Sequence, residues 1–532
     1  MWLVGSRFSL NADSTFSLRH LPTWLLIIGY PAFWLEMALK SGPHTSAAAS
    51  VLFIWLTIFL LHIFRKRSGV SSQLKLSPSF YVWGIPILLI LMISFFQSIL
   101  PLHLPQEADA LNYHYALPRQ HLILGTFKHL PWSTADLWPL PIQYGLSPFW
   151  FVCDLPNKFP QFLFLLGLFS LTWSMSARLT TNAFSRWLAV AALAGSHGLA
   201  IQFGTAMLDI PMAYLALASI ESLLSGRPRL AALELSFFAW GKSFVPLEVA
   251  CILVVALTAR WFGKRCGFTW RLGFDENPLD NSVAWKTFVL TFLASSVAIA
   301  GPFLAKSIYY AGTPLFPFGT FCLGGKLMHP EPLRQAVTTA AQDMVAMRNA
   351  YGEGRNLVDL LAHVWRVSVP SRGVNNAFDY PLGLPFLLLA APFLYLFGHS
   401  LARRRIPLLA GLAILLWGMW WMGSQQSRWL YFPLILIILT TTTHPLAQEN
   451  RALQVGLWIA LPLVLLSIFR ASAPDLKIWP QAALRLQDRD LLNRSRQWHQ
   501  LIPMPVQDKE VAYAEVPVVV VQGAAAWVLD VH

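Results

Sequence analysis

The stretch Glu107-Ala-Asp-Ala-Leu-Asn-Tyr-His-Tyr-Ala-Leu-Pro-Arg119 directly follows a long apolar run over residues 81–100. It brings four ionisable side chains together: Glu107, Asp109, His114 and Arg119. Acidic residues are scarce in this chain, with 26 Asp and Glu among 532 residues. One interpretation is a helix cap with polar residues at a membrane interface. The other is an acid–base or metal-binding cluster at the water-facing edge of a membrane enzyme.

Composition predicts an all-α, polytopic integral membrane protein. The chain is 55% hydrophobic and 12% charged, whereas a soluble protein carries about 25% charged residues. The net charge of +13 does not indicate nucleic acid as a partner, because the sequence has no basic tract with interleaved aromatic residues. Lys and Arg instead cluster between apolar runs, as they do in cytoplasmic loops.

The apolar runs predict a bundle of about thirteen transmembrane helices. Arg65-Lys-Arg67 and Arg403-Arg-Arg405 then lie in the cytoplasm, with the N-terminus, and the C-terminus lies outside. The predicted spans are 22–39, 49–64, 82–100, 158–176, 187–204, a span from 209 to about 225, two short helices within 230–259, and then 287–305, 382–398, 406–422, 429–443 and 453–470.

Three regions follow from this topology. Residues 1–81 are predicted to form a cytoplasmic tail and a transmembrane hairpin, residues 82–470 the main transmembrane domain, and residues 471–532 a short tail outside the membrane. Within the domain, two long outer loops at 101–157 and 306–380 carry helices that we expect to lie on the membrane surface, although residues 140–153 could dip into the bilayer.

Eight polar residues share the predicted outer face although they are far apart in the sequence. They are Glu107, Asp109, His114, Arg119, Asp209, Lys242, Lys306 and Arg428. Cations at such a face could neutralise a phosphate leaving group, and a carboxylate could deprotonate an acceptor hydroxyl. A transporter would more often place its ionisable residues within the spans, where Glu234 and Glu248 are the residues that fit this alternative.

The order of several motifs resembles the membrane-embedded glycosyltransferases of the GT-C fold, which move a sugar from a polyprenyl-phosphate carrier. The bacterial members similar to protein O-mannosyltransferases and aminoarabinose transferases are nearest. The motifs are Glu107-Ala-Asp109 followed by Tyr113-His114 and Pro118-Arg119, then Leu208-Asp209-Ile-Pro211, Gly241-Lys242-Ser243, Ala311-Gly-Thr-Pro-Leu-Phe-Pro-Phe318 and Arg428-Trp-Leu-Tyr-Phe-Pro433. The chain departs from the family in its additional N-terminal hairpin and in Thr313, where Asn is expected.

The resemblance implies a role for each polar residue. Asp109 would be the catalytic base or the carboxylate that positions the acceptor, and Asp209 would be its partner across the cavity. Glu107 would join this catalytic set, where it would cap the helix or help to hold a cation. Lys242 and Arg428 would bind the carrier phosphate, and the substrate would also meet the remaining polar residues, His114, Arg119 and Lys306. Asp109 and Asp209 could share a divalent cation, Mg²⁺, Mn²⁺ or Zn²⁺. The partners implied are a polyprenyl-phosphate-sugar donor and a lipid, glycan or protein acceptor, used by a cell-envelope enzyme of the bacterial inner membrane whose active site faces the periplasm.

Each residue also has a simpler interpretation. Asp209 could cap the helix that contains Pro211. Lys242 could be a lysine that extends to the membrane interface, Arg428 could anchor the topology, and His114 could be structural because it has no second ligand at metal-binding spacing. The functional alternatives are a transporter or flippase of lipid-linked sugars and a non-catalytic protein of envelope polysaccharide assembly.

Overall fold

The computed structural model describes most of the predicted helical part of the chain. The described ranges are 18–40, 84–99, 109–130, 133–150, 158–242, 282–314, 351–369, 380–403 and 408–456, with a few isolated residues besides. Helices form all the regular structure in these ranges, and no strand occurs in them. The predicted all-α class is therefore confirmed for the described residues. The predicted span at 49–64 and the tail at 471–532 lie outside them.

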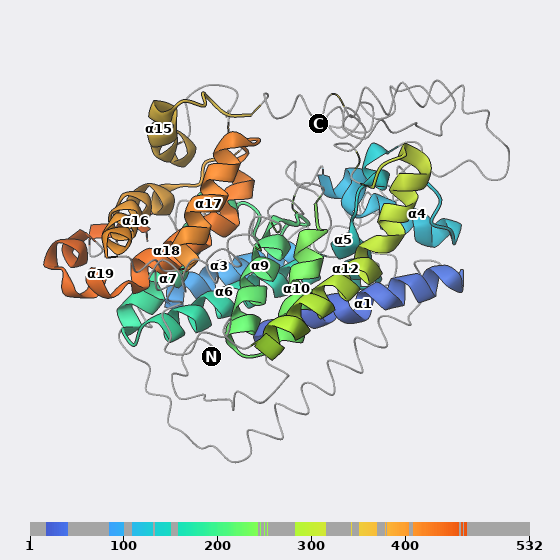
Figure 1. The fold of residues 1–532 in the computed structure, drawn as a ribbon, viewed down its shortest axis with the longest axis horizontal. Helices are drawn as coiled ribbons and strands as arrows, with labels where there is room; N and C mark the ends of the chain where they lie inside the picture. Colours follow the sequence, from blue (N-terminus) through green and yellow to red (C-terminus); the bar gives the residue numbers. More distant parts are fainter. Residues whose placement is uncertain are drawn as a thin grey trace, which may run out of the picture.

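Figure 1 shows how the helices are arranged, with α9 and α10 near the middle of the assembly. Their bounds are η1 (Leu18–His20), α1 (Leu21–Ala38), α3 (Ile85–Ile99), the π-helix η4 (Ala110–His114), α4 (Ala116–Leu124), η5 (Thr134–Leu137), α5 (Pro141–Trp150), α6 (Phe159–Leu179), α7 (Ala183–Ala194), α8 (His197–Ala200), α9 (Asp209–Leu224), α10 (Pro228–Ala239), α12 (Ser282–Ala311), α15 (Leu357–Ser368), α16 (Leu384–Ala402), α17 (Leu408–Met422), η8 (Ser427–Leu430), α18 (Tyr431–Thr443) and α19 (Pro445–Glu449).

Among the helices in the described ranges, four are long and apolar enough to cross a membrane, which fits a membrane protein. They are Leu21–Ala38, Phe159–Leu179, Val283–Ala311 and Leu384–Ala402. Three shorter apolar helices, at Ile85–Ser98, Ala183–Ala194 and Leu408–Met422, coincide with further predicted spans. The total of thirteen spans, their sidedness and the three-region division stay predictions.

The helices differ from the predicted ranges in three places. The predicted span 187–204 is interrupted, because α7 ends at Ala194 and residues 201–208 form a turn between α8 and α9. The predicted span 287–305 is too short, because α12 continues to Ala311 and contains Lys306 rather than ending before it. Helix α5 lies in the outer loop 101–157, where surface helices or a segment dipping into the bilayer were expected, and all of its ten residues are buried in the protein. It packs along α1.

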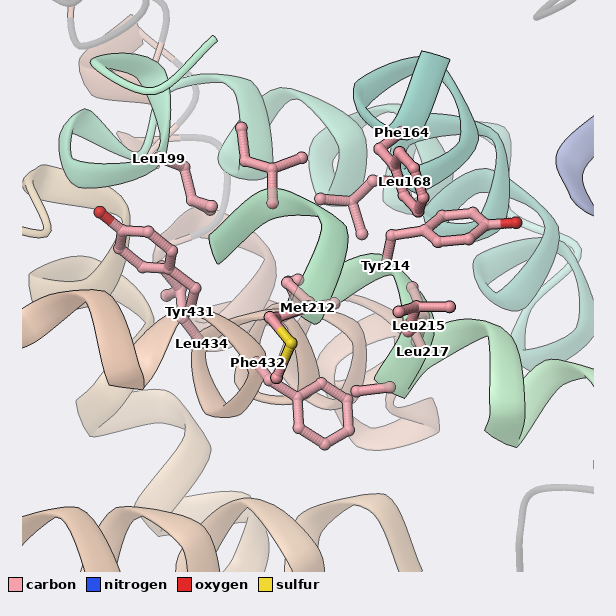
Figure 2. Packing of buried hydrophobic residues seen from close by; sticks show 14 of the residues in the cluster. Phe164, Leu168, Leu199, Met212, Tyr214, Leu215, Leu217, Tyr431, Phe432 and Leu434 are labelled. Atoms are coloured by element: carbon pink, nitrogen blue, oxygen red, sulfur yellow. The ribbon is translucent and has the colours of Figure 1, made fainter. Parts of the chain in front are cut away.

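Helix α9 forms the centre of the hydrophobic core. Figure 2 shows Met212, Tyr214 and Leu215 of this helix between side chains of α6 and of α18. The ring of Tyr214 meets that of Phe164 edge-to-face, with 5.1 Å between the ring centroids. Pro211 lies in the first turn, where the missing amide hydrogen removes no helical hydrogen bond. Packing on both sides therefore fixes the position of the Asp209 end of α9.

Two glycines allow α1 and α5 to approach each other closely. A β-carbon at Gly29 would overlap the carbonyl oxygen of Gly145 and would lie 2.7 Å from the ring of Phe149. The nearest obstacle is backbone, which cannot move aside as a flexible side chain can. Gly29 is therefore required for the contact that holds α5 in the interior.

We expect Gly29→Ala to destabilise the protein by about 1–3 kcal/mol, because overpacking forces the two backbones apart. Gly398 of α16 is a matched control, since a β-carbon there meets no atom within 4 Å. Gly398→Ala should be neutral or stabilising by up to about 1 kcal/mol, the usual effect in a helix. Thermal unfolding of both purified variants measures the difference, and equal midpoints would contradict the close contact.

A buried charge network, the His20 network, joins the start of α1 to the ends of neighbouring helices. Nδ1 of His20 donates to Glu234 (2.8 Å) and Nε2 donates to Glu221 (3.0 Å). Glu221 also pairs with three guanidinium groups, those of Arg19, Arg178 and Arg227. Glu234, which the sequence offered as a transporter-like residue, is thus engaged by His20 and by the hydroxyl of Thr23.

The His20 network should make stability depend on pH. Burial alone would lower the pKa of His20, but the charge of Glu234 and hydrogen bonds to both carboxylates raise it above its ordinary value. Because the pKa of His20 is higher in the folded than in the unfolded protein, the charged ring contributes its full stabilisation below about pH 6.5, the pKa of an unfolded histidine. This stabilisation is lost as the pH rises through the pKa of His20 in the folded protein.

His20→Gln should therefore cost about 3–5 kcal/mol at pH 6, the penalty for breaking a buried ion pair, and less at pH 9. The measurement is the thermal midpoint of wild type and variant at both pH values. A difference that is independent of pH would show that His20 is not charged in the folded protein.

Candidate active site

Asp109 and Arg428, separated by 319 positions in the sequence, form an ion pair. Nη1 of Arg428 donates to Oδ2 of Asp109 at 3.0 Å, and its Nε donates to the amide oxygen of Gln426 at 3.0 Å. Asp109 immediately precedes η4, and its side chain caps no backbone N–H of that helix. Arg428 lies in η8, just before α18. The helix-cap interpretation of Asp109 is therefore wrong, and Arg428 is more than a topology anchor.

Asp209 and Lys242 form a second ion pair, between the start of α9 and the turn after α10. The ammonium group of Lys242 contacts Oδ1 of Asp209, and the amide of Gln202 donates to Oδ2 at 3.0 Å. The N-cap of α9 is Leu208, and no side chain caps this helix. The cap interpretation of Asp209 is thus wrong as well, because both carboxylate oxygens are used by other side chains.

Gly241 explains how Lys242 reaches Asp209. Helix α10 ends at Ala239, and the chain turns at Trp240 and Gly241. A β-carbon at Gly241 would lie 2.8 Å from Cδ1 of Ile142 and closer still to the sulfur of Met212. The predicted turn at Gly241-Lys242 is therefore confirmed, and a larger residue at Gly241 would require the side chains of Ile142 and Met212 to move.

The two ion pairs are neighbours. Arg428 is close enough to Asp209 for their charges to interact, and His114 is within the electrostatic range of all four charged groups. We call Asp109, Arg428, Asp209 and Lys242 the four-charge cluster. Its formal charges cancel, with two carboxylates and two cations. This arrangement stabilises each charge where isolated ones would be expensive to bury.

His114 and Tyr113 adjoin the cluster as neutral groups. Burial lowers the pKa of His114 to about 3, and the nearby cations support the shift, so the ring is uncharged at neutral pH. Nδ1 of His114 lies 3.2 Å from Nε2 of Gln143, which places His114 in a hydrogen bond within the protein. Burial and the charge of Asp109 raise the pKa of the Tyr113 hydroxyl well above its ordinary value.

The members of the cluster differ in their access to solvent. The side chain of Asp109 is 31% exposed, whereas that of Asp209 is 4% exposed. The two cations are intermediate, at 19% for Arg428 and 18% for Lys242. A molecule that enters from solvent therefore reaches Asp109 first and Asp209 last.

Lys306 does not join the four-charge cluster. It forms a separate buried group around Asp136, which accepts from Nζ of Lys306 (2.7 Å) and from the backbone N–H of Leu130 (2.7 Å). Nε2 of His121 (2.9 Å) and Nδ1 of His129 (3.0 Å) donate to the same carboxylate. Burial alone would raise the pKa of Asp136, but Lys306 and the two histidines hold it well below its ordinary range.

The Asp136 group supports the segment that carries Tyr113 and His114. His121 lies in α4, directly after η4, and Trp138 follows the short helix η5 that contains Asp136. The rings of Trp138 and Tyr113 meet edge-to-face with 5.6 Å between centroids. Lys306 thus ties α12 to the loop beside the cluster and acts on the site through other residues.

The other predicted site residues are placed as follows. Arg119 is buried in α4, and the ion pairs of the cluster join Asp109 to Arg428 and Asp209 to Lys242. Glu107 lies outside the described residues. Sequence reasoning missed Gln202 and Asp136, because the first was placed inside a predicted span and the second carried no motif.

In the described part of the chain, no three His, Cys, Asp or Glu side chains are arranged to hold a metal ion. Both carboxylates of the cluster are already bound to cationic side chains. The described donor set therefore does not fit the divalent cation that the sequence resemblance suggested for Asp109 and Asp209.

Asp136→Asn should destabilise the protein by about 3–5 kcal/mol, because it leaves Lys306 charged and buried without its partner. Removing both charges, in Asp136→Asn with Lys306→Met, should recover part of this loss. A double-mutant cycle of unfolding free energies measures the coupling. Additive losses would mean that the two side chains do not depend on each other.

No protein-family model, curated protein or solved structure matches this chain. The resemblance to GT-C glycosyltransferases accordingly rests on the sequence motifs quoted above. The functional argument rests on the four-charge cluster, in which four segments distant in sequence contribute two carboxylates and two cations.

Proposed function

We propose that the protein is a membrane glycosyltransferase that moves a sugar from a polyprenyl-phosphate carrier to a lipid, glycan or protein acceptor. The observation that carries this proposal is the convergence of Asp109, Arg428, Asp209 and Lys242. The proposal places the reaction on the periplasmic face of a bacterial inner membrane. This sidedness follows from the basic loops of the sequence.

The chemistry of such a transfer needs the groups present in the cluster. The acceptor oxygen forms a bond to the anomeric carbon, and the bond from that carbon to the phosphate oxygen breaks. The acceptor proton passes to a carboxylate, and the bonding electrons leave with the phosphate. Cationic donors stabilise the charge that develops on the phosphate, and general-base help contributes about 10²–10⁴-fold.

An exchange of ion pairs connects the observed arrangement to this reaction. Each cation of the cluster is paired with a carboxylate. A carrier phosphate competes with the carboxylates for the guanidinium of Arg428 and the ammonium of Lys242. When Arg428 turns to the phosphate, Asp109 loses its cation and becomes a better proton acceptor.

Asp109 is the better candidate for the base, and Asp209 for a positioning group. Asp109 has one described cationic partner and is the most exposed member of the cluster, so an acceptor hydroxyl can reach it. Asp209 is held on both oxygens and is nearly inaccessible. Asp209 is therefore suited to hold Lys242 and Gln202 in a fixed orientation.

A transporter or flippase receives less support. Glu234 was a reason for considering it, and this carboxylate is engaged by His20 and Thr23 in a buried network. A non-catalytic role in envelope polysaccharide assembly would give no chemical task to two adjacent ion pairs, one of which contains the partly exposed carboxylate of Asp109.

The decisive experiment incubates purified protein with labelled polyprenyl-phosphate sugars and a membrane extract as acceptor source, and follows loss of donor. Asp109→Asn should lower turnover by at least about 100-fold, because it removes the base and keeps the shape. Asp359→Asn is a matched control, since this carboxylate caps α15 and pairs with Arg366. The control should retain turnover within about twofold of wild type.

Other outcomes would revise or remove the proposal. An active Asp109→Asn with an inactive Asp209→Asn would exchange the two roles. Full activity in both variants would leave the cluster without a catalytic function. Movement of the intact donor across a proteoliposome membrane, without loss of the sugar, would favour the transporter instead.

A further inference from the structure

The amide of Gln202 has a determined orientation. Gln202 is 3% exposed and lies in the turn that leads into α9. Its Nε2 donates to Oδ2 of Asp209 at 3.0 Å and lies 3.4 Å from the hydroxyl oxygen of Tyr431. Because a carboxylate only accepts hydrogen bonds, the NH₂ group must face Asp209. The amide oxygen consequently points away from both partners.

This amide oxygen has no hydrogen-bond partner in the described part of the chain, although it is buried. A buried acceptor without a donor is costly, and native structures satisfy most such atoms with protein, water or ligand. Gln202 differs in this respect from Gln143, a second buried amide whose partner is Nδ1 of His114, because a ring nitrogen can donate or accept and does not fix the orientation of the amide.

We propose that the free oxygen of Gln202 binds a hydroxyl or amino hydrogen of the sugar that is transferred. This inference rests on the proposed glycosyltransferase function. A carrier phosphate at neutral pH has oxygens that accept hydrogen bonds, so it offers no donor to a second acceptor. The hydroxyl and amino groups of a sugar do offer donors. The sugar therefore lies against Gln202, and the phosphate lies toward Lys242 and Arg428.

Gln202 is then a specificity-determining residue. A site that accepts a hydrogen bond from a substrate hydroxyl rejects an analogue without that hydroxyl, because the buried acceptor is left unpaired. The residue is rigidly supported for this purpose. Its backbone N–H donates to the carbonyl of Leu199 at 3.0 Å, and its own carbonyl accepts from the N–H of Thr205 at 3.1 Å.

The experiment measures the affinity of the protein in nanodiscs for three ligand types: polyprenyl-phosphate sugars, their monodeoxy or deamino analogues, and the polyprenyl phosphate without sugar. For wild type, one deletion on the sugar should weaken binding about tenfold. In Gln202→Met, and in the second variant Gln202→Leu, the same deletion should change affinity less than about twofold. Gln161→Met is the matched control, because Gln161 is a buried amide in α6 that accepts from Trp150. It should retain the tenfold discrimination.

The outcomes separate this inference from the function on which it rests. If wild type binds no polyprenyl-phosphate sugar, the proposed function fails. If wild type binds the sugars but tolerates every deletion, the amide oxygen is satisfied by water and the inference is wrong. If the Gln202 variants lower the affinity for all three ligand types by the same factor, including the polyprenyl phosphate without sugar, Gln202 only holds Asp209 and the inference is again wrong.

Discussion

The contact between Asp209 and Lys242 is the interaction on which the candidate site depends. It joins the first residue of α9 to the residue that follows the turn after α10, and Gln202 completes it from the preceding turn. A buried carboxylate without such partners would be neutralised or expelled. The ion pair can form because packing brings the two ends together: α9 is enclosed by α6 and α18, and Gly241 lets the turn approach Met212.

Charges occupy both ends of α9, and they have different roles. Asp209 and Glu221 are twelve residues apart, which corresponds to about 18 Å along a helix. At the Glu221 end, the two buried carboxylates of the His20 network are each engaged within the protein. At the Asp209 end, the cluster keeps a partly exposed carboxylate and a buried amide oxygen without a partner. The first arrangement is closed to solvent around its carboxylates, whereas the second leaves the Asp109 carboxylate within reach of solvent.

The sequence predicted the helical class and much of the site because those features have local or compositional signals. Apolar runs located α1, α6 and α16. Scarce acids after the apolar run 81–100 and at the start of the span from residue 209 singled out Asp109 and Asp209. Polar partners deep in the fold have no such signal. Asp136 could not be linked to Lys306 from sequence, because 170 positions separate them and only tertiary packing brings them together. Gln202 was hidden because Gly195-Ser196, which precede its turn, were read as part of one continuous span.

The surroundings of Lys306 were also misjudged from the sequence, because they too depend on tertiary packing. Its place at the end of an apolar run suggested an exposed cation, but α12 continues beyond it and buries its ammonium group beside Asp136. A lysine in such a place stabilises the fold only while its carboxylate remains, so it serves as a tie between α12 and the loop that carries His114. Lys242 and Arg428, in contrast, remain partly exposed. Burial therefore distinguishes Lys306, which holds the loop, from the two cations of the cluster that solvent can reach.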